Sequence, residues 1–145
     1  MDWKKEAIQK LKGLEGAKSA LTSIPEELER IELKMTGIRS VSTDGDPVTG
    51  GGNKREDMLI NQITLKEELR RRLRENELWI SSVERALSCL SEEDRVVLDR
   101  LYIHSTRGAT DRLCAELNIE KSTAYYRRDN ALRNFTRAYY GYEAV

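Results

Sequence analysis

Residues 65–90, LKEELRRRLRENELWISSVERALSCL, repeat apolar side chains at the spacing of an α-helical coiled coil. The positions that define the repeat lie three or four residues apart: Leu65, Leu69, Leu73, Asn76, Ile80, Val83, Leu87 and Leu90. This spacing predicts a helix whose apolar stripe packs against a second helix. We expect the helix to run from about residue 57 to residue 90, with Asn76 as the polar position that can fix the register of the pair.

A matching stripe lies in the first 39 residues, where apolar side chains are spaced 4, 3, 4 and 3 residues apart: Ile24, Leu28, Ile31, Met35 and Ile38. Pro25 follows a Ser-Ile pair, so we expect this helix to break or kink near Thr22 and to resume at Ile24. Residues 40–56 hold four of the nine glycines and one of the two prolines, which predicts a flexible loop. The two stripes then pair as a long antiparallel helical hairpin over residues 1–90.

Residues 91–145 have a different pattern, with three short helices expected at 91–102, 110–117 and 122–140. The last two are joined by a four-residue turn, which is the arrangement of a helix-turn-helix motif. Cys114 is small enough for a close helix crossing, Asn118 tolerates a left-handed backbone, and Ser122 can cap the third helix. The sequence therefore predicts an all-α protein: a coiled-coil-like antiparallel hairpin (1–90, with the Gly-rich loop at 40–56) followed by a small helix-turn-helix domain (91–145).

Residues 110–129, TDRLCAELNIEKSTAYYRRD, resemble the helix-turn-helix of the sigma-70 region 4 superfamily. The resemblance extends to LSEEDRVVLDRLYI at 90–103 and to STAYYRRDNALRNF at 122–135. A charged helical hairpin in front of this module is similar to the ArpU-like and RinA-like phage regulators of late, packaging and lysis genes. Arg127 departs from the pattern, because the family usually has an apolar residue there. Either its stem covers the core or Tyr126 turns inward in its place.

The resemblance implies a set of DNA contacts. Side chains at the start of the third helix are expected to contact bases in the major groove: Lys121, Ser122, Thr123, Tyr125, Tyr126 and Arg128. Side chains before and within the preceding helix are expected to contact phosphates: Arg107, Thr110 and Arg112. Residues 104–138 hold seven basic and four acidic side chains, in a chain whose formal net charge is zero. This local excess of positive charge favours DNA weakly, so useful affinity is expected to need a dimer or a second protein.

Catalytic chemistry has little support in the composition. The single histidine, His104, and the two cysteines, Cys89 and Cys114, do not have the spacing of a zinc site. We therefore expect no enzyme activity, no catalytic residue, no metal and no cofactor, and we expect both cysteines to be free and buried. No stretch is apolar enough to span a membrane. The resemblance to phage regulators implies the cytoplasm of a bacterial host as the location.

The functional interpretation is a sequence-specific DNA-binding transcriptional regulator of phage or prophage type. Its expected partners are double-stranded DNA, host RNA polymerase and a second copy of the chain, with the hairpin as a dimerisation or protein-docking arm. Two alternatives stay open: a small terminase-like packaging component, which would assemble into rings, and a protein-interaction module that acts on RNA polymerase without binding DNA. The arginine run at 70–74 is flanked by glutamates, which favours a salt-bridged helix face over a second DNA site.

Overall fold

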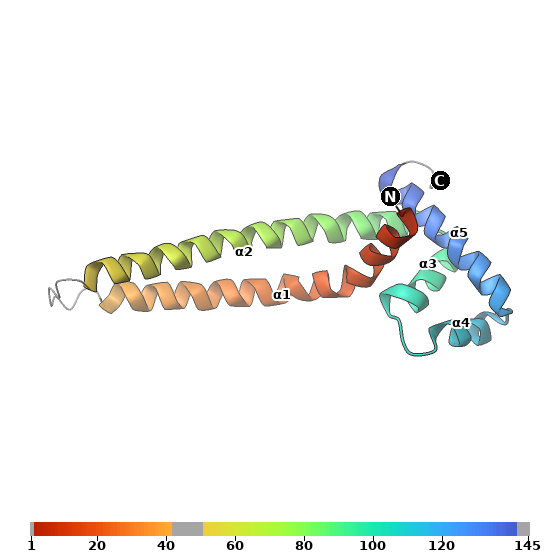
Figure 1. Cartoon of the computed structure of the whole chain (residues 1–145), viewed down its shortest axis with the longest axis horizontal. Helices are drawn as coiled ribbons and strands as arrows, with labels where there is room; N and C mark the ends of the chain where they lie inside the picture. Colours follow the sequence, from red (N-terminus) through yellow and green to blue (C-terminus); the bar gives the residue numbers. More distant parts are fainter. Residues whose placement is uncertain (1, 42–50, 142–145) are drawn as a thin grey trace. The chain divides into compact units, whose positions relative to one another are not determined.

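The computed structural model describes residues 2–41 and 51–141 of the 145-residue chain, and side chains of residues 2–39 and 54–141. The elements within these ranges are all helical (Figure 1): α1 (Trp3–Val41), α2 (Gly51–Ser88), α3 (Glu92–Leu98), the π-helix η1 (Asp99–Ile103), α4 (Ala109–Leu117) and α5 (Lys121–Tyr140). The expected all-α fold, a helical hairpin followed by smaller helices, is confirmed. The chain forms two compact units, residues 18–77 and residues 1–17 with 78–145, which are described separately below.

The hairpin unit, residues 18–77, consists of antiparallel stretches of α1 and α2 (Figure 1). Ile24, Ile31 and Met35 of α1 are buried, as the predicted stripe of the first helix requires, whereas Leu28 and Ile38 of the same stripe are half-buried. Across the pair, the Lys66 ammonium lies 2.5 Å from a carboxylate oxygen of Glu32. Apolar packing and this ion pair together hold the two helices in register.

Three expectations for the hairpin are wrong. Helix α1 continues through Pro25 without the expected break, because proline removes only one helix hydrogen bond and the buried stripe continues on both sides of it. Helices cover residues 40–41 and 51–56 of the expected loop, and residues 42–50 lie outside the described residues. Leu65 is 43% exposed, whereas its neighbour Lys66 is half-buried and takes the inward position opposite Glu32.

The other unit, residues 1–17 and 78–145, contains most of the protein's buried apolar side chains. Helix α5 packs on α3 and α4. The largest fully buried side chains of this unit come from α1, α3, α4 and α5: Leu11, Leu14, Leu98, Leu113, Leu132 and Phe135. Helix α2 adds the fully buried Val83. The domain boundary expected at residue 90 stays a prediction, but this core draws on both ends of the hairpin sequence.

Local details of the C-terminal helices differ from expectation in two places. Ser91 caps α3 as its sequence suggests, since its hydroxyl oxygen accepts the Asp94 backbone N–H at 3.2 Å. Ser122 is not a cap, because α5 begins at Lys121 and Glu120 is its N-cap residue. Cys89 is exposed rather than buried, because Ala86 and Leu90 take the inward positions of this helix end.

The first turns of α1 contact the C-terminal end of α5 through a hydrogen bond and cation–π contacts. The Tyr140 hydroxyl donates to a Glu6 carboxylate oxygen at 3.2 Å. The Lys10 ammonium lies 4.9 Å from the ring centroid of Tyr139 and 5.7 Å from that of Tyr140. Through these cation–π contacts the two tyrosines pack against the first turns of α1.

Candidate nucleic-acid interface

The turn between α4 and α5 has the backbone of a helix-turn-helix. Asn118 ends α4 in the left-handed conformation, at φ 55° and ψ 52°. The Ile119 N–H donates to the Cys114 carbonyl at 3.0 Å, which satisfies a free carbonyl at the helix end. Leu113 and Ala124 are buried where the two helices meet. The predicted close crossing and the left-handed turn residue are therefore both present.

The first two turns of α5 present a polar and aromatic face to solvent. Lys121 and Ser122 are exposed, and Thr123 is half-buried. Tyr125 is 43% exposed and Tyr126 is 68% exposed, which is unusual for large aromatic side chains. Five of the expected base-contacting side chains thus share the solvent-accessible start of one helix.

The exposed face includes an ion pair that links the two helices of the motif. The Lys121 ammonium lies 3.3 Å from a carboxylate oxygen of Asp111, in the first turn of α4. Hydrogen bonding to Asp111 and the charge of its carboxylate raise the pKa of Lys121 above its ordinary value. Lys121 is therefore charged at neutral pH and is held beside the N-terminus of α4.

Arg128 lies deeper than the other expected base-contacting residues. Its side chain is half-buried, and its guanidinium carbon lies 4.9 Å from the ring centroid of Tyr125. Its Nε donates to a carboxylate oxygen of Asp129 at 3.2 Å. In this position the guanidinium supports the Tyr125 ring.

An open hollow of about 430 Å³ separates the starts of α4 and α5. Its lining includes Thr110 and Lys121, one from each expected contact class, together with Tyr102, Tyr125 and Arg128. Partial burial raises the pKa of the Tyr102 phenol, so this hydroxyl stays protonated and can donate a hydrogen bond. The hollow brings expected base contacts and an expected phosphate contact to one surface.

The remaining expected phosphate contacts, Arg107 and Arg112, are close in sequence to residues that line the hollow. Arg107 is exposed in the segment before α4. The Arg112 guanidinium donates to the Thr106 hydroxyl at 2.9 Å, which ties α4 to the same segment. Both guanidiniums remain accessible to solvent, as phosphate contacts require.

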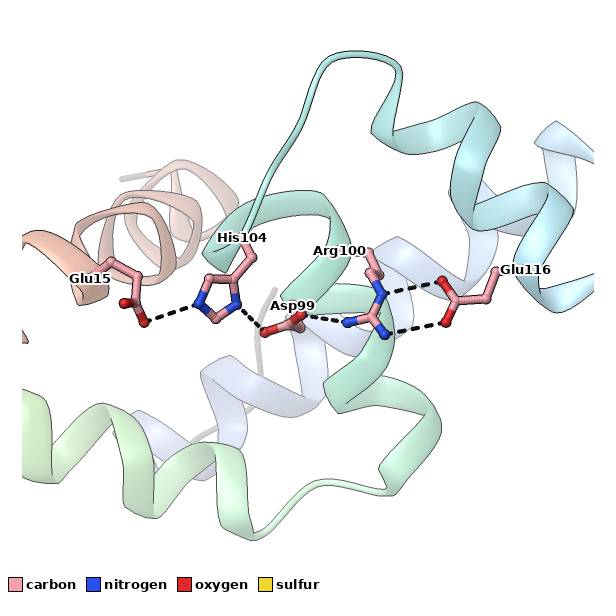
Figure 2. Close-up of polar contacts among 5 residues, drawn as sticks. All are labelled: Glu15, Asp99, Arg100, His104 and Glu116. Atoms are coloured by element: carbon pink, nitrogen blue, oxygen red, sulfur yellow. Dashed lines mark hydrogen bonds and ion pairs between the residues drawn. The ribbon is translucent and has the colours of Figure 1, made fainter.

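A series of polar and charged side chains connects α1, η1 and α4 (Figure 2). His104 lies between two carboxylates, with Nδ1 2.7 Å from Asp99 and Nε2 3.3 Å from Glu15. Arg100 connects Asp99 to Glu116 of α4, at 2.6 Å and 3.2 Å respectively. The π-helix η1 supplies Asp99 and Arg100, so this irregular turn joins α1 to the first helix of the motif.

Arg127 adopts the first of the two arrangements considered from its sequence. It is half-buried and its guanidinium pairs with Glu93 of α3, while Tyr126 stays exposed. Sequence reasoning missed the acidic partners Asp111 and Asp129. The pairing of Asp111 with Lys121 depends on the helix crossing and has no signal in the sequence.

The described residues contain neither a membrane-spanning helix nor a metal-binding cluster. No helix within them is long and apolar enough to cross a membrane. No group of three or more histidine, cysteine, aspartate or glutamate side chains among them is placed to hold a metal ion.

Comparison with known proteins gives one match. No curated protein and no solved structure matches the chain. Residues 37–136 match the family described as Protein of unknown function (DUF1492). This match covers more than half of the chain, including all of α2, α3, η1 and α4 and most of α5. The protein therefore belongs to the DUF1492 family.

Proposed function

We propose that this protein is a sequence-specific DNA-binding regulator of transcription, of the type that controls late, packaging or lysis genes in phages and prophages. The observation that carries the proposal is the start of α5, where Lys121, Ser122, Tyr125 and Tyr126 are exposed directly after a left-handed turn. In helix-turn-helix proteins this position enters the major groove. The resemblance to sigma-70 region 4 supports the same assignment.

The two classes of expected contact have different consequences for binding. Lys121, Ser122, Thr123, Tyr125, Tyr126 and Arg128 are assigned to base contacts, and Arg107, Thr110 and Arg112 to phosphates. Phosphate contacts raise the affinity for every sequence, whereas base contacts change the preference between sequences. The excess of positive charge is small, so a dimer on two half-sites supplies the affinity that one copy lacks.

The hairpin is proposed as the arm that brings in the second copy or host RNA polymerase. Several large apolar side chains in the hairpin unit are exposed: Leu33, Met58, Ile60, Ile63 and Leu65. Exposed apolar side chains on adjacent turns of a helix are typical of surfaces that another chain covers. Recruitment or repositioning of the polymerase at a promoter then rests on the resemblance to phage regulators.

The test is a titration of the purified chain against its own upstream region and against random duplex DNA, at about 50 mM and about 200 mM salt. We expect salt-sensitive binding to both and tighter binding to the upstream fragment. Tyr126→Ala and Lys121→Ala are expected to reduce the preference between fragments by about tenfold. Arg112→Ala is expected to weaken binding to both fragments equally, and Arg85→Ala, a charge-matched change outside the motif, is expected to leave both unchanged.

Two results would overturn the proposal. Absence of binding at the lower salt concentration would remove DNA as a partner of the isolated chain. Equal losses for Tyr126→Ala and Arg112→Ala on both fragments would remove the division between base and phosphate contacts. The mass in solution gives a further check, because a large ring would favour a small terminase-like component over a dimeric regulator.

A further inference from the structure

Asp129 of α5 is a partly buried carboxylate that pairs with two cations. One is its sequence neighbour Arg128, and the other is the distant Lys4 of α1. Arg128 Nε donates to its Oδ1 at 3.2 Å, and the Lys4 ammonium of α1 lies 3.3 Å from the same oxygen. The side chains of Lys4, Arg128 and Asp129 are 41%, 33% and 32% exposed. Partial burial pushes the pKa of Asp129 upward, but the hydrogen bonds and charges of Arg128 and Lys4 outweigh it, and the pKa lies below its ordinary value. Asp129 is therefore ionised and holds both cations.

Arg128 carries this constraint to Tyr125. The two residues are three apart on α5, so their side chains are neighbours on one face of the helix. The Arg128 guanidinium lies 4.9 Å from the Tyr125 ring centroid, a cation–π contact. Because Nε is bonded to Asp129, the guanidinium is kept over the ring instead of rotating into solvent.

The position of Lys4 is itself defined. The Asp2 carboxylate accepts the backbone N–H groups of Lys4 and Lys5, at 3.1 Å and 3.3 Å, and so caps the first turn of α1. Lys4 then points to Asp129, whereas Lys5 is exposed and forms no ion pair with any described residue. The two lysines carry the same charge in the same turn. They differ in the Asp129 contact and in a longer approach of the Lys4 ammonium to the Trp3 ring, 5.8 Å from its centroid.

We propose that Lys4 is a positioning residue of the DNA interface, which acts through Asp129 and Arg128 to fix the ring of Tyr125. This inference rests on the proposed function and adds to it the first turn of α1, which lies outside the helix-turn-helix. Lys4 contributes to base preference without contacting DNA. Its loss leaves Asp129 with one cation and gives Arg128 and Tyr125 more rotamers, which must be ordered again when the specific complex forms.

The experiment compares Lys4→Met with Lys5→Met in the full chain. Each variant removes one positive charge from the same turn, so the general electrostatic loss is matched. We expect Lys4→Met to lower the ratio of affinities for the upstream fragment and for random duplex by about two- to fivefold, the size that a partly exposed ion pair supports. Lys5→Met is expected to leave this ratio unchanged, and Lys4→Arg is expected to restore it. Equal ratios for Lys4→Met and Lys5→Met would overturn the inference.

A second measurement needs no DNA. In ¹³C-tyrosine NMR of the free protein, with the Tyr125 signal assigned by Tyr125→Phe, we expect Lys4→Met to shift the Tyr125 ring signals and Lys5→Met to leave them in place. Unchanged ring signals in Lys4→Met would overturn the positioning role even if the wild-type protein binds DNA. If Lys4→Met shifts the ring signals but the wild-type protein binds no DNA, the structural link is retained and the proposed function alone is overturned.

Discussion

The two compact units of the protein are both helical, but they are stabilised differently. Residues 1–17 with 78–145 bury side chains from α1, α2, α3, α4 and α5, including Leu98 and Phe135 at no measurable exposure. Residues 18–77 bury only three apolar side chains among those described, Ile24, Ile31 and Met35, and expose five large ones. The unit of residues 1–17 and 78–145, called the core unit below, depends on a core that several helices share. The hairpin unit depends on a narrow apolar stripe and on ion pairs at its surface. Each unit should therefore respond to a different kind of substitution.

The largest expected change in the free energy of unfolding comes from a substitution in the core unit. Phe135→Ala removes a fully buried ring at the centre of α5 and should lower the free energy of unfolding by about 3–5 kcal/mol. Ile31→Ala in the hairpin should cost about 2 kcal/mol, because its stripe is narrow and water can enter beside it. Urea denaturation gives the total loss for each variant, and amide hydrogen exchange shows which helices open.

Amide hydrogen exchange can also contradict the difference in stabilisation between the two units. Phe135→Ala should raise exchange in α3, α4 and α5, and Ile31→Ala should raise it within residues 18–77. If both variants raised exchange equally throughout the chain, the two units would unfold as one cooperative structure, and their different packing would have no thermodynamic consequence.

The sequence was most informative where a periodic pattern and a backbone requirement agree. The stripe of Ile24, Ile31 and Met35 is buried as its spacing predicts. Asn118 adopts the left-handed conformation that the turn requires, because its side chain tolerates positive φ better than most. Both features are local, so a single sequence contains them.

The failures are positions where tertiary packing decides. Leu65 has the right spacing for the inward stripe, but Lys66 takes that place because it meets Glu32 of the other helix. Pro25 is a strong helix breaker locally, yet packing on both sides keeps α1 continuous. In the candidate site, Asp111 meets Lys121 through the helix crossing, and Asp129 meets Lys4 through the fold of α1. The spacing of residues in one sequence cannot show either contact.

A smaller effect distinguishes the two units by their threonines. Thr136 of α5 is fully buried, and its hydroxyl has no hydrogen-bond partner among the described residues. Thr36 and Thr64 of the hairpin are exposed and donate to carbonyls four residues earlier, at 2.9 Å and 3.0 Å. Thr136→Val keeps the shape and removes a buried hydroxyl that gains nothing, so it should stabilise the protein by about 1 kcal/mol.

Matched changes test this interpretation of Thr136. Thr64→Val should change the free energy of unfolding by less than about 0.5 kcal/mol, since its hydroxyl is exposed to water in any case. Thr136→Ser keeps the hydroxyl and loses a methyl group, so it should destabilise by about 1 kcal/mol. A destabilising Thr136→Val, measured in the same urea titrations, would mean that the hydroxyl is bonded in solution.

The glycines of α1 give a third, comparable contrast. A Cβ at Gly13 would lie 2.8 Å from the Trp79 ring, whereas at Gly16 and Gly37 it would meet nothing within 4 Å. Alanine has a higher helix propensity than glycine. We therefore expect stabilisation by about 0.5–1 kcal/mol from Gly37→Ala in the hairpin unit and from Gly16→Ala in the core unit. Gly13→Ala should lose this gain or reverse it, since the indole must move. Thermal denaturation of the three variants measures the difference, and equal gains would show that Trp79 is not held against α1.

The smallest expected effect is the pH dependence that Glu32 gives to the hairpin. Hydrogen bonding to Lys66, with the charge of its ammonium, lowers the pKa of Glu32 below the ordinary value of 4.5. A carboxylate whose pKa is lower in the folded than in the unfolded state stabilises the fold above the unfolded value. That contribution is lost as the pH falls through the folded value. Hairpin stability should therefore be constant near neutral pH and should decline in acid.

Glu32→Gln isolates this contribution, because it removes the charge while keeping a group that can hydrogen-bond. Amide exchange within residues 24–38 should be slightly faster in the variant than in the wild type at neutral pH, and the difference should vanish below the folded pKa. Both partners are partly exposed to solvent, so the difference should also shrink at high salt. Glu29→Gln, on the exposed side of the same helix, should show no such pH-dependent difference. A gap between wild type and Glu32→Gln that persists in strong acid would mean that the side chain contributes through packing, and the hairpin would then resemble the core unit more closely than its narrow stripe suggests.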